Sequence, residues 1–327
     1  MPLPTRLDAA LLYPAQPQVD FAAIAASVNA IMAPSGLSLE VASLKPGKGA
    51  KLKGDTPGGT ITLTIALSPK PMPESRLATA MASDYGRLQG ADWPTTCSQH
   101  RAFLAVVAEA RGKGSGGQQS FETLLALTQI AAEQLAMEAL PLAVYWGQSN
   151  QLFSSERFMA MADVLFPLPL FIHPRPFSSG RMAEGTQCMG VRLDHAEQVL
   201  GRALVFREAP SRLPYILDRA YAFIDHCRAT GRILGDGAEF GAGPSEVIRV
   251  SHHGPGPEHP TGHIALTLRE LDGVFLLQPD GEDNAPGIAS ARADTVPSGP
   301  PPTGDPTAEA VNDFFSTPDA KARARHG

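Results

Sequence analysis

An alternation of apolar and polar side chains over residues 60–68 limits the fold more than any other feature of this sequence. The apolar positions alternate with threonine and alanine: Ile61, Leu63, Ile65 and Leu67 stand against Thr62, Thr64 and Ala66. Because successive side chains of a β-strand point to opposite faces of its sheet, this period predicts a strand with one buried face. The chain must therefore build a sheet, and the segments on either side decide its type.

The segments around this strand follow a recognisable order of elements. Apolar runs predict further strands, and helical spacing predicts helices in between: strands at 9–13, 37–44 and 101–109, helices at 21–31 and 74–83. The order strand, helix, strand, strand, helix, strand is typical of the ferredoxin-like split βαβ motif, in which helices cover one face of an antiparallel sheet. It recurs later, with strands at 142–146, 168–173, 186–193 and 246–251 and helices at 155–164 and 211–229.

This repeated order predicts an α+β protein of two ferredoxin-like βαββαβ units with helices on one face. The first unit spans residues 1–117 and the second spans 118–278; the alternative is one continuous antiparallel sheet built from both. From Pro279 onward the chain is rich in proline, glycine, aspartate and alanine, with Pro300, Pro301 and Pro302 in a row. A segment of that composition buries too little apolar surface to order itself, so we expect a disordered tail over 279–327.

The net charge and the cysteines indicate which partners and which cellular compartment suit this chain. With 33 acidic and 27 basic residues, the net charge of −6 gives no general attraction for nucleic acid, and we expect none to bind. Cys97, Cys188 and Cys227 are widely spaced and odd in number, as in a reducing compartment. The start lacks a signal-peptide pattern and no apolar run is long enough to span a membrane, so we expect a cytoplasmic protein without a membrane partner.

Several short motifs after residue 140 resemble one family. They are Ala-Val-Tyr-Trp-Gly at 143–147, Ser-Ser-Glu-Arg-Phe at 154–158 and Pro-Leu-Pro-Leu-Phe at 167–171, with further runs at 190–197 and 231–237. They resemble bacterial proteins that carry the domain of unknown function 4261, over about residues 140–270. At 194–197 this chain has Asp-His-Ala-Glu in place of Gly-His-Pro-Glu. The family has no assigned activity, so the resemblance implies no cofactor and no site residues.

The best candidate binding site lies at the ends of two predicted strands. Tyr145, Trp146 and Gln148 end one strand, and His173 and Arg175 end a neighbouring one. Aromatic residues and arginine dominate binding hot spots, and side chains at adjacent strand ends can line a shared cleft. The alternative is that both aromatic rings pack beneath the following helix.

Histidines provide two further candidates. His195 and Glu197 would share one face of a strand, where a carboxylate beside an imidazole supports acid–base catalysis; the alternative is a polar turn. A second group consists of four histidines that, with Glu258, could ligate zinc, copper or nickel: His252, His253, His259 and His263. Their spacing matches no standard metal-binding motif, and the alternative is that they lie in a solvated hairpin loop.

These patterns favour a non-enzymatic interaction or regulatory protein that holds a protein partner. The alternative is a metal-dependent hydrolase or a small-ligand-binding protein that uses a cleft between the halves. Glycine-rich loops at 45–53 and 235–243 lack the order of a P-loop or a dinucleotide fingerprint, so we predict no cofactor. The sequence leaves the oligomeric state open.

Overall fold

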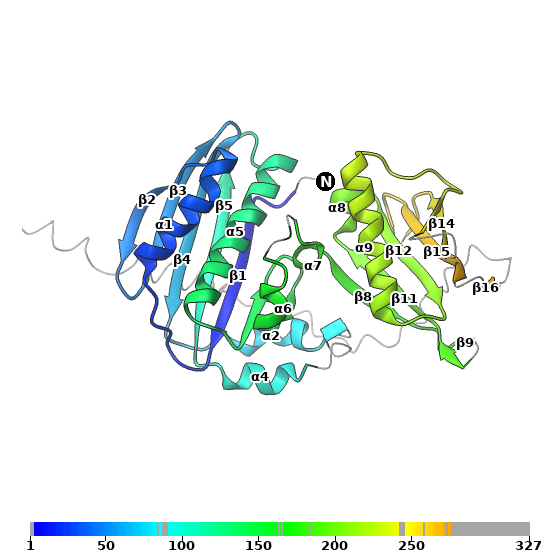
Figure 1. Cartoon of the computed structure of the whole chain (residues 1–327), viewed down its shortest axis with the longest axis horizontal. Coiled ribbons are helices and arrows are strands. Elements are labelled where there is room, and N and C mark those ends of the chain that lie inside the picture. Colours follow the sequence, from blue (N-terminus) through cyan, green and yellow to red (C-terminus); the bar gives the residue numbers. More distant parts are fainter. Residues whose placement is uncertain are drawn as a thin grey trace, which may run out of the picture. The chain divides into compact units, whose positions relative to one another are not determined.

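The computed structural model describes residues 3–275, apart from gaps at 84, 87–90, 163, 165, 184, 242–245, 258 and 272–273. The described residues form a mixed α+β fold, as expected, and divide into two compact units (Figure 1). Unit 1 holds the residues up to Arg175 together with Leu193–Gln198, and unit 2 holds Pro176–Arg192 and the residues from Val199. The predicted boundary at 117/118 lies inside unit 1, and the predicted tail over 279–327 lies outside the described residues.

Unit 1 is built on a seven-stranded sheet whose order is β2-β3-β4-β5-β1-β6-β7. Every neighbouring pair in this sheet is antiparallel. The strands are β1 (Arg6–Tyr13), β2 (Glu40–Lys45), β3 (Gly49–Thr56), β4 (Gly59–Ser68), β5 (Ala102–Arg111), β6 (Ala143–Trp146) and β7 (Gln151–Phe153). The strand predicted from the alternation at 60–68 is therefore confirmed as β4.

Helices cover both faces of this sheet. The long helices α1 (Phe21–Met32) and α5 (Gln118–Glu138) lie side by side on one face (Figure 1). On the other face, α2 (Glu74–Met81) and α4 (Trp93–Gln99) pack on apolar side chains of β1, β5 and β6. Asp20 caps α1, accepting hydrogen bonds from the amides of Ala22 and Ala23. Two covering layers explain why β5 is apolar at nearly every position.

The ferredoxin-like arrangement of four strands is not confirmed for unit 1. Strand β3 occupies residues expected to form a hairpin loop, and β6 and β7 extend the sheet beyond β1. The prediction of helices on one face is wrong for unit 1, since α2 and α4 cover the second face. The predicted strand at 168–173 is also wrong: Leu168–Phe171 form the short helix α7, and β8 (His173–Phe177) begins after it.

Unit 2 contains a second, separate sheet, so the alternative of one continuous sheet is wrong. Its order is β13-β14-β15-β12-β11-β8, with β16 paired to β15, and β12 runs parallel to β15. The other strands of this sheet are β11 (Met189–Asp194), β12 (Ala203–Ala209), β13 (Glu239–Phe240), β14 (Glu246–His253), β15 (His263–Leu271) and β16 (Val274–Phe275). Strands β9 (Met182–Ala183) and β10 (Thr186–Gln187) pair with each other in a two-stranded sheet. Helix α9 (Leu213–Thr230) lies over one face of this sheet (Figure 1), and Gly231 caps its C-terminal end in a left-handed conformation.

Two findings bear on the environment of the chain. Among the described residues, no helix combines the length and the apolar character that a bilayer crossing needs. All three cysteines are buried and unpaired, and burial raises the pKa of the Cys97 thiol to about 11. A thiol that stays protonated is a poor nucleophile, so Cys97 acts as a small apolar side chain.

Candidate functional site

The structure places Trp146 in the core of unit 1. Its side chain is fully buried and its ring lies 6.2 Å from that of Phe158, centroid to centroid. Phe158 belongs to α6 (Ser155–Met159), the helix that follows in the sequence. This is the packing that the sequence offered as the alternative to a binding role, and it leaves Trp146 no surface for a ligand.

Tyr145 is buried as well, but its polar end holds a turn in place. Its hydroxyl donates to Oδ1 of Asn150 over 3.0 Å, and the guanidinium of Arg76 lies 5.8 Å from its ring centroid. Arg76 in turn pairs with Asp8 over 3.4 Å. These contacts fix the β6–β7 turn at 147–150, which contains Gln148 in a half-buried position.

His173 binds this same turn from the start of β8. Its Nδ1 lies 2.7 Å from the carbonyl oxygen of Ser149. A carbonyl oxygen only accepts hydrogen bonds, so Nδ1 donates and the Nε2 of the neutral ring stays unprotonated. Burial lowers the pKa of His173, partly offset by this hydrogen bond and by the charge of Asp194.

Arg175 and Asp194 add an ion pair beside His173. The Nε of Arg175 contacts the carboxylate of Asp194, and the two side chains are 58% and 24% exposed. The charges of Asp194, Arg175 and His195 all act on His173. Three sequence candidates, His173, Arg175 and His195, therefore meet in one group. With Ser149 and Asp194, we call this group the turn cluster.

Backbone strain surrounds the turn cluster. Within the described parts of the chain, the non-glycine residues with positive φ are Asn150 (49°), Phe166 (61°) and His195 (74°). The ring of Phe171 joins the last two, at 5.7 Å from Phe166 and 6.3 Å from His195. Asparagine and histidine adopt this conformation more often than other non-glycine residues, whereas phenylalanine does so only where the surrounding structure holds it. Such residues concentrate at functional sites, which marks this region as the candidate site.

The expected pairing of His195 with Glu197 on one strand face does not occur. Strand β11 ends at Asp194, and Glu197 lies in the first turn of α8 (Ala196–Leu200). Nδ1 of His195 instead lies 3.3 Å from the side-chain amide nitrogen of Gln198. The strand ends early because His195 adopts a positive φ, which a continuing strand does not allow.

In unit 2, three of the four candidate histidines gather. His253 and His263 stand opposite each other on β14 and β15, with stacked rings 4.3 Å apart, and the ring of His259 lies 4.7 Å from that of His263. His252 points elsewhere: its Nε2 binds the carbonyl of Leu234 and its Nδ1 accepts from Arg202. We call His253, His259 and His263 the histidine cluster.

The geometry of the histidine cluster does not suit a metal ion. The stacked rings of His253 and His263 are nearly parallel, at 9°, so their nitrogen lone pairs do not converge on one point. Across the described ranges, no three histidine, cysteine, aspartate or glutamate side chains are grouped in a way that could hold a metal ion. Glu258, the expected oxygen ligand, lies outside those ranges.

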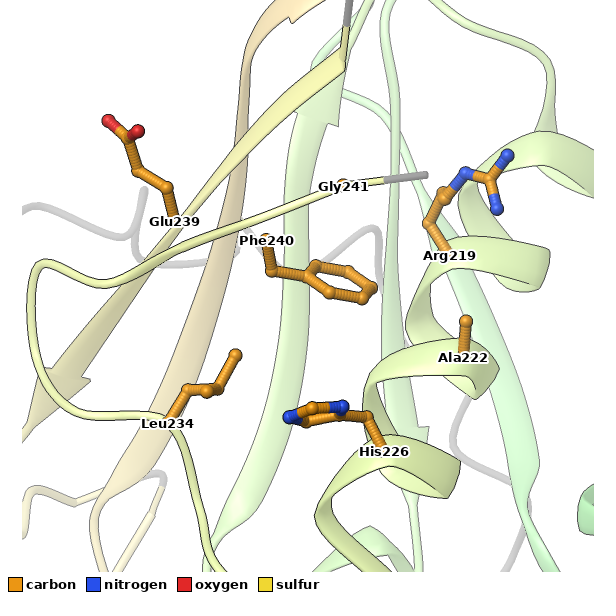
Figure 2. A pocket seen from close by; sticks show the side chains of 7 residues that line it. All are labelled: Arg219, Ala222, His226, Leu234, Glu239, Phe240 and Gly241. Atoms are coloured by element: carbon orange, nitrogen blue, oxygen red, sulfur yellow. The ribbon is translucent and has the colours of Figure 1, made fainter. Parts of the chain in front are cut away.

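An open hollow of about 510 Å³ lies along α9 in unit 2 (Figure 2). Arg219, Ala222 and His226 line it from the helix, and the ring of Phe240 points toward them from the opposite wall, while the carboxylate of Glu239 points away. The ring of Phe240 packs edge-on against Phe223, with centroids 5.7 Å apart. Arg219 is already balanced by two carboxylates, those of Asp218 and Glu246.

Sequence reasoning missed Arg207, and it did not predict that Asp194, named there only beside His195 and Glu197, pairs with Arg175. Asp194 pairs with Arg175, and Arg207 donates to His253 over 3.1 Å. The signal for Asp194 was present, because it stands next to His195, but its partner depends on the pairing of β8 with β11. Arg207 carries no local signal, since it is one of two adjacent charged residues on β12.

Comparison of the chain with family models, with curated proteins and with solved structures finds no match. The resemblance to the domain of unknown function 4261 therefore stays a prediction. The case for a function rests on the chemistry of the sites themselves.

Proposed function

We propose that the protein is a non-enzymatic binding protein that holds a partner protein on unit 1, with Arg175 at the centre of the contact. The observation that carries this proposal is the state of Arg175, which is more than half exposed although its Nε is fixed by Asp194. Arginine is enriched in binding hot spots. One that is oriented in advance loses less conformational freedom when a partner binds.

The partner chemistry follows from the geometry of the ion pair. Asp194 engages the Nε of Arg175, and within the described ranges Arg175 forms no ion pair or hydrogen bond with another residue. A planar guanidinium can donate from these nitrogens to a second carboxylate. The proposal therefore specifies a partner that presents an aspartate or glutamate side chain.

The turn cluster supplies a rigid base for this contact. His173 is hydrogen-bonded to the backbone of Ser149, and Tyr145 fixes the same turn through Asn150. The strained backbone at His195 lies beside Asp194, the residue that orients Arg175. A surface held in this way keeps its shape before the partner arrives, which supports recognition more than catalysis.

The test is quantitative capture of partners from the protein's own cells with wild-type, Arg175→Gln and Arg111→Gln chains. Arg111 is a matched control, because it is also an exposed arginine of unit 1 paired with a carboxylate, that of Glu109. We expect one stoichiometric partner with the wild-type and control chains. Arg175→Gln should weaken the affinity for that partner by about tenfold or more, measured with purified components.

Two results would contradict the proposal. One is equal affinity of the Arg175→Gln and wild-type chains for the captured partner. The other is stoichiometric metal in the same samples without any partner, which would favour the metal-dependent hydrolase instead. Because Arg175 is exposed, its substitution should leave the free energy of unfolding within about 0.5 kcal/mol of the wild-type value, so loss of fold does not confuse the test.

The hollow along α9 favours a second candidate function, binding of a small molecule by unit 2. Its walls combine the apolar side chains of Leu234 and Phe240 with the polar ends of His226 and Arg219. A flat, mostly apolar compound fits such a surface. Ala222→Phe would fill the hollow, so a compound that raises the melting temperature of the wild-type chain should fail to raise that of the variant.

A further inference from the structure

Unit 2 holds a group of cationic and protonatable side chains that the function proposed for unit 1 does not use. It consists of the histidine cluster together with Arg207, whose Nη2 donates to Nε2 of His253 over 3.1 Å. The rings of His253 and His263 are 4.3 Å apart, and those of His259 and His263 are 4.7 Å apart. Groups that carry or gain positive charge repel one another at such distances, so an anion would stabilise their arrangement.

The arrangement is built by the fold and does not depend on a loosely solvated loop. Backbone hydrogen bonds hold the described residues between β14 and β15: Gly256 and His259 exchange bonds of 3.0 and 3.2 Å, and the amide of Gly262 donates to His259 over 2.8 Å. Gly262 has a φ of 76°, and a Cβ there would lie 2.5 Å from the carbonyl oxygen of His253. These contacts hold the ring of His259 beside that of His263.

We propose that the histidine cluster and Arg207 form a binding site for a phosphate monoester. Nη2 of Arg207 donates to His253 and the guanidinium has further N–H donors, while His259 and His263, once protonated, offer N–H groups from the loop and from β15. A phosphate monoester has three terminal oxygens that accept hydrogen bonds from several directions, whereas a planar carboxylate is satisfied by the arginine fork alone. Donors from separate elements therefore suit a tetrahedral anion better.

The electrostatics of the site agree with this assignment. Burial, His253, His259 and Arg207 together lower the pKa of His263 to about 4. A bound dianion would oppose these charges and favour the imidazolium, so binding of the anion and protonation of His263 should promote each other.

The test follows the imidazole C–H resonances of the full chain by nuclear magnetic resonance during addition of inorganic phosphate, and separately of O-phosphoserine, at constant ionic strength. Both probes should shift the resonances of His263 and His253 saturably and leave that of His226, on α9, unchanged. With saturating probe, the titration midpoint of His263 should rise by about one pH unit or more, equivalent to a tenfold gain in proton affinity.

Arginine variants show whether the anion binds at this site or is attracted only by the positive charge of exposed arginines. Arg207→Gln should weaken binding of both probes by about tenfold, and Arg207→Lys, which keeps the charge without the fork, should fall between. Arg232→Gln, at an exposed arginine elsewhere in unit 2, should bind as the wild type does. The resonance of His226 reports whether each variant is folded.

Three outcomes would overturn the proposal. The first is an equal response of the histidine resonances to chloride and to phosphate. The second is unchanged affinity in Arg207→Gln. The third is binding of inorganic phosphate without binding of O-phosphoserine, which would make this a site for the free ion and not for a monoester.

Discussion

Tyr145, Trp146 and Arg175 are all residue types that occur in binding hot spots, and burial separates their roles. Trp146 and Tyr145 are almost completely buried, whereas the Arg175 side chain is 58% exposed. Removing a buried ring leaves a cavity that the surroundings fill only in part. Substitution of Trp146 should therefore affect folding, and substitution of Arg175 should affect binding.

Trp146→Ala should lower the free energy of unfolding by about 3–5 kcal/mol, because the fully buried ring packs against Phe158. Urea unfolding followed by circular dichroism measures this loss. Gln148→Ala, in the adjacent turn, is the control and should stay within about 0.5 kcal/mol of the wild type. A Trp146→Ala chain as stable as the wild type would show that the ring is not part of the core.

Two substitutions of His195 test the backbone strain at this position, because the loss of the side chain is common to both. His195→Gly and His195→Ala both remove the ring, but only glycine adopts a φ of 74° without steric cost. The glycine variant should therefore be more stable than the alanine variant by about 1 kcal/mol in urea unfolding. At Glu197, inside α8, the same pair should show the reverse order, because alanine favours a helix over glycine. Equal stabilities of the two His195 variants would argue against strain at this position.

The sequence identifies several members of the turn cluster as candidate site residues, but it does not predict that they lie close together. His173, Arg175 and His195 stand out locally as polar residues at strand ends. Their contact depends on how β8 and β11 pair and on the turn at 147–150, and neither follows from local pattern. Burial of Trp146 likewise depends on where α6 packs, so an aromatic residue at a strand end fits the core and the surface equally well.

At the scale of elements, a regular pattern of apolar residues predicts a helix or strand correctly, whereas a segment that mixes apolar residues with lysine and glycine does not. The alternation in β4, the apolar run in β5 and the cap of α1 each identify an element that the structure contains. Strand β3 was missed because Lys51 and Lys53 alternate with Ala50 and Leu52, and the lysines and glycines suggest a loop. Helix α7 is too short to show a period, so its apolar residues fit a strand equally well.

The hairpin β14–β15 should make stability depend on pH. The pKa of His263 is about 4 in the folded chain, below its ordinary value of 6.5, because of burial and the charges of His253, His259 and Arg207. Between these values the unfolded chain binds a proton at His263 and the folded chain does not. The contribution of His263 to the free energy of unfolding should therefore be present in full above pH 6.5 and should be lost as the pH is lowered toward 4. Urea unfolding at pH 8, 6 and 5 measures this trend.

Substitutions of single histidines test whether His263 causes this pH dependence. His263→Asn should reduce the loss of stability between pH 8 and pH 5, whereas His226→Asn, at an exposed histidine of α9, should leave it unchanged. The pKa of His173 is lowered too, mainly by burial, so part of the dependence should remain in the His263 variant. Identical pH profiles of wild type and His263→Asn would contradict the assignment.

At the scale of the whole molecule, two separate cores predict two unfolding transitions. The chain has two tryptophans, Trp93 and Trp146, and both are buried in unit 1. Tryptophan fluorescence should therefore follow unit 1 alone, while far-ultraviolet circular dichroism follows both units. We expect the two urea transitions not to coincide, and to separate further at pH 5, where His263 destabilises unit 2. Coincident transitions at both pH values would show that the chain unfolds as one cooperative unit.

The two units are also interleaved along the chain. Residues Leu193–Gln198 belong to unit 1, yet they follow Pro176–Arg192, which belong to unit 2. A ribosome makes the chain from its N-terminus, and a nascent domain completes its fold only when its last segment has emerged. Asp194 and His195 therefore reach unit 1 after the first strands of unit 2 have been synthesised. A fragment of the chain that ends before residue 193 would therefore hold Arg175 without its carboxylate partner.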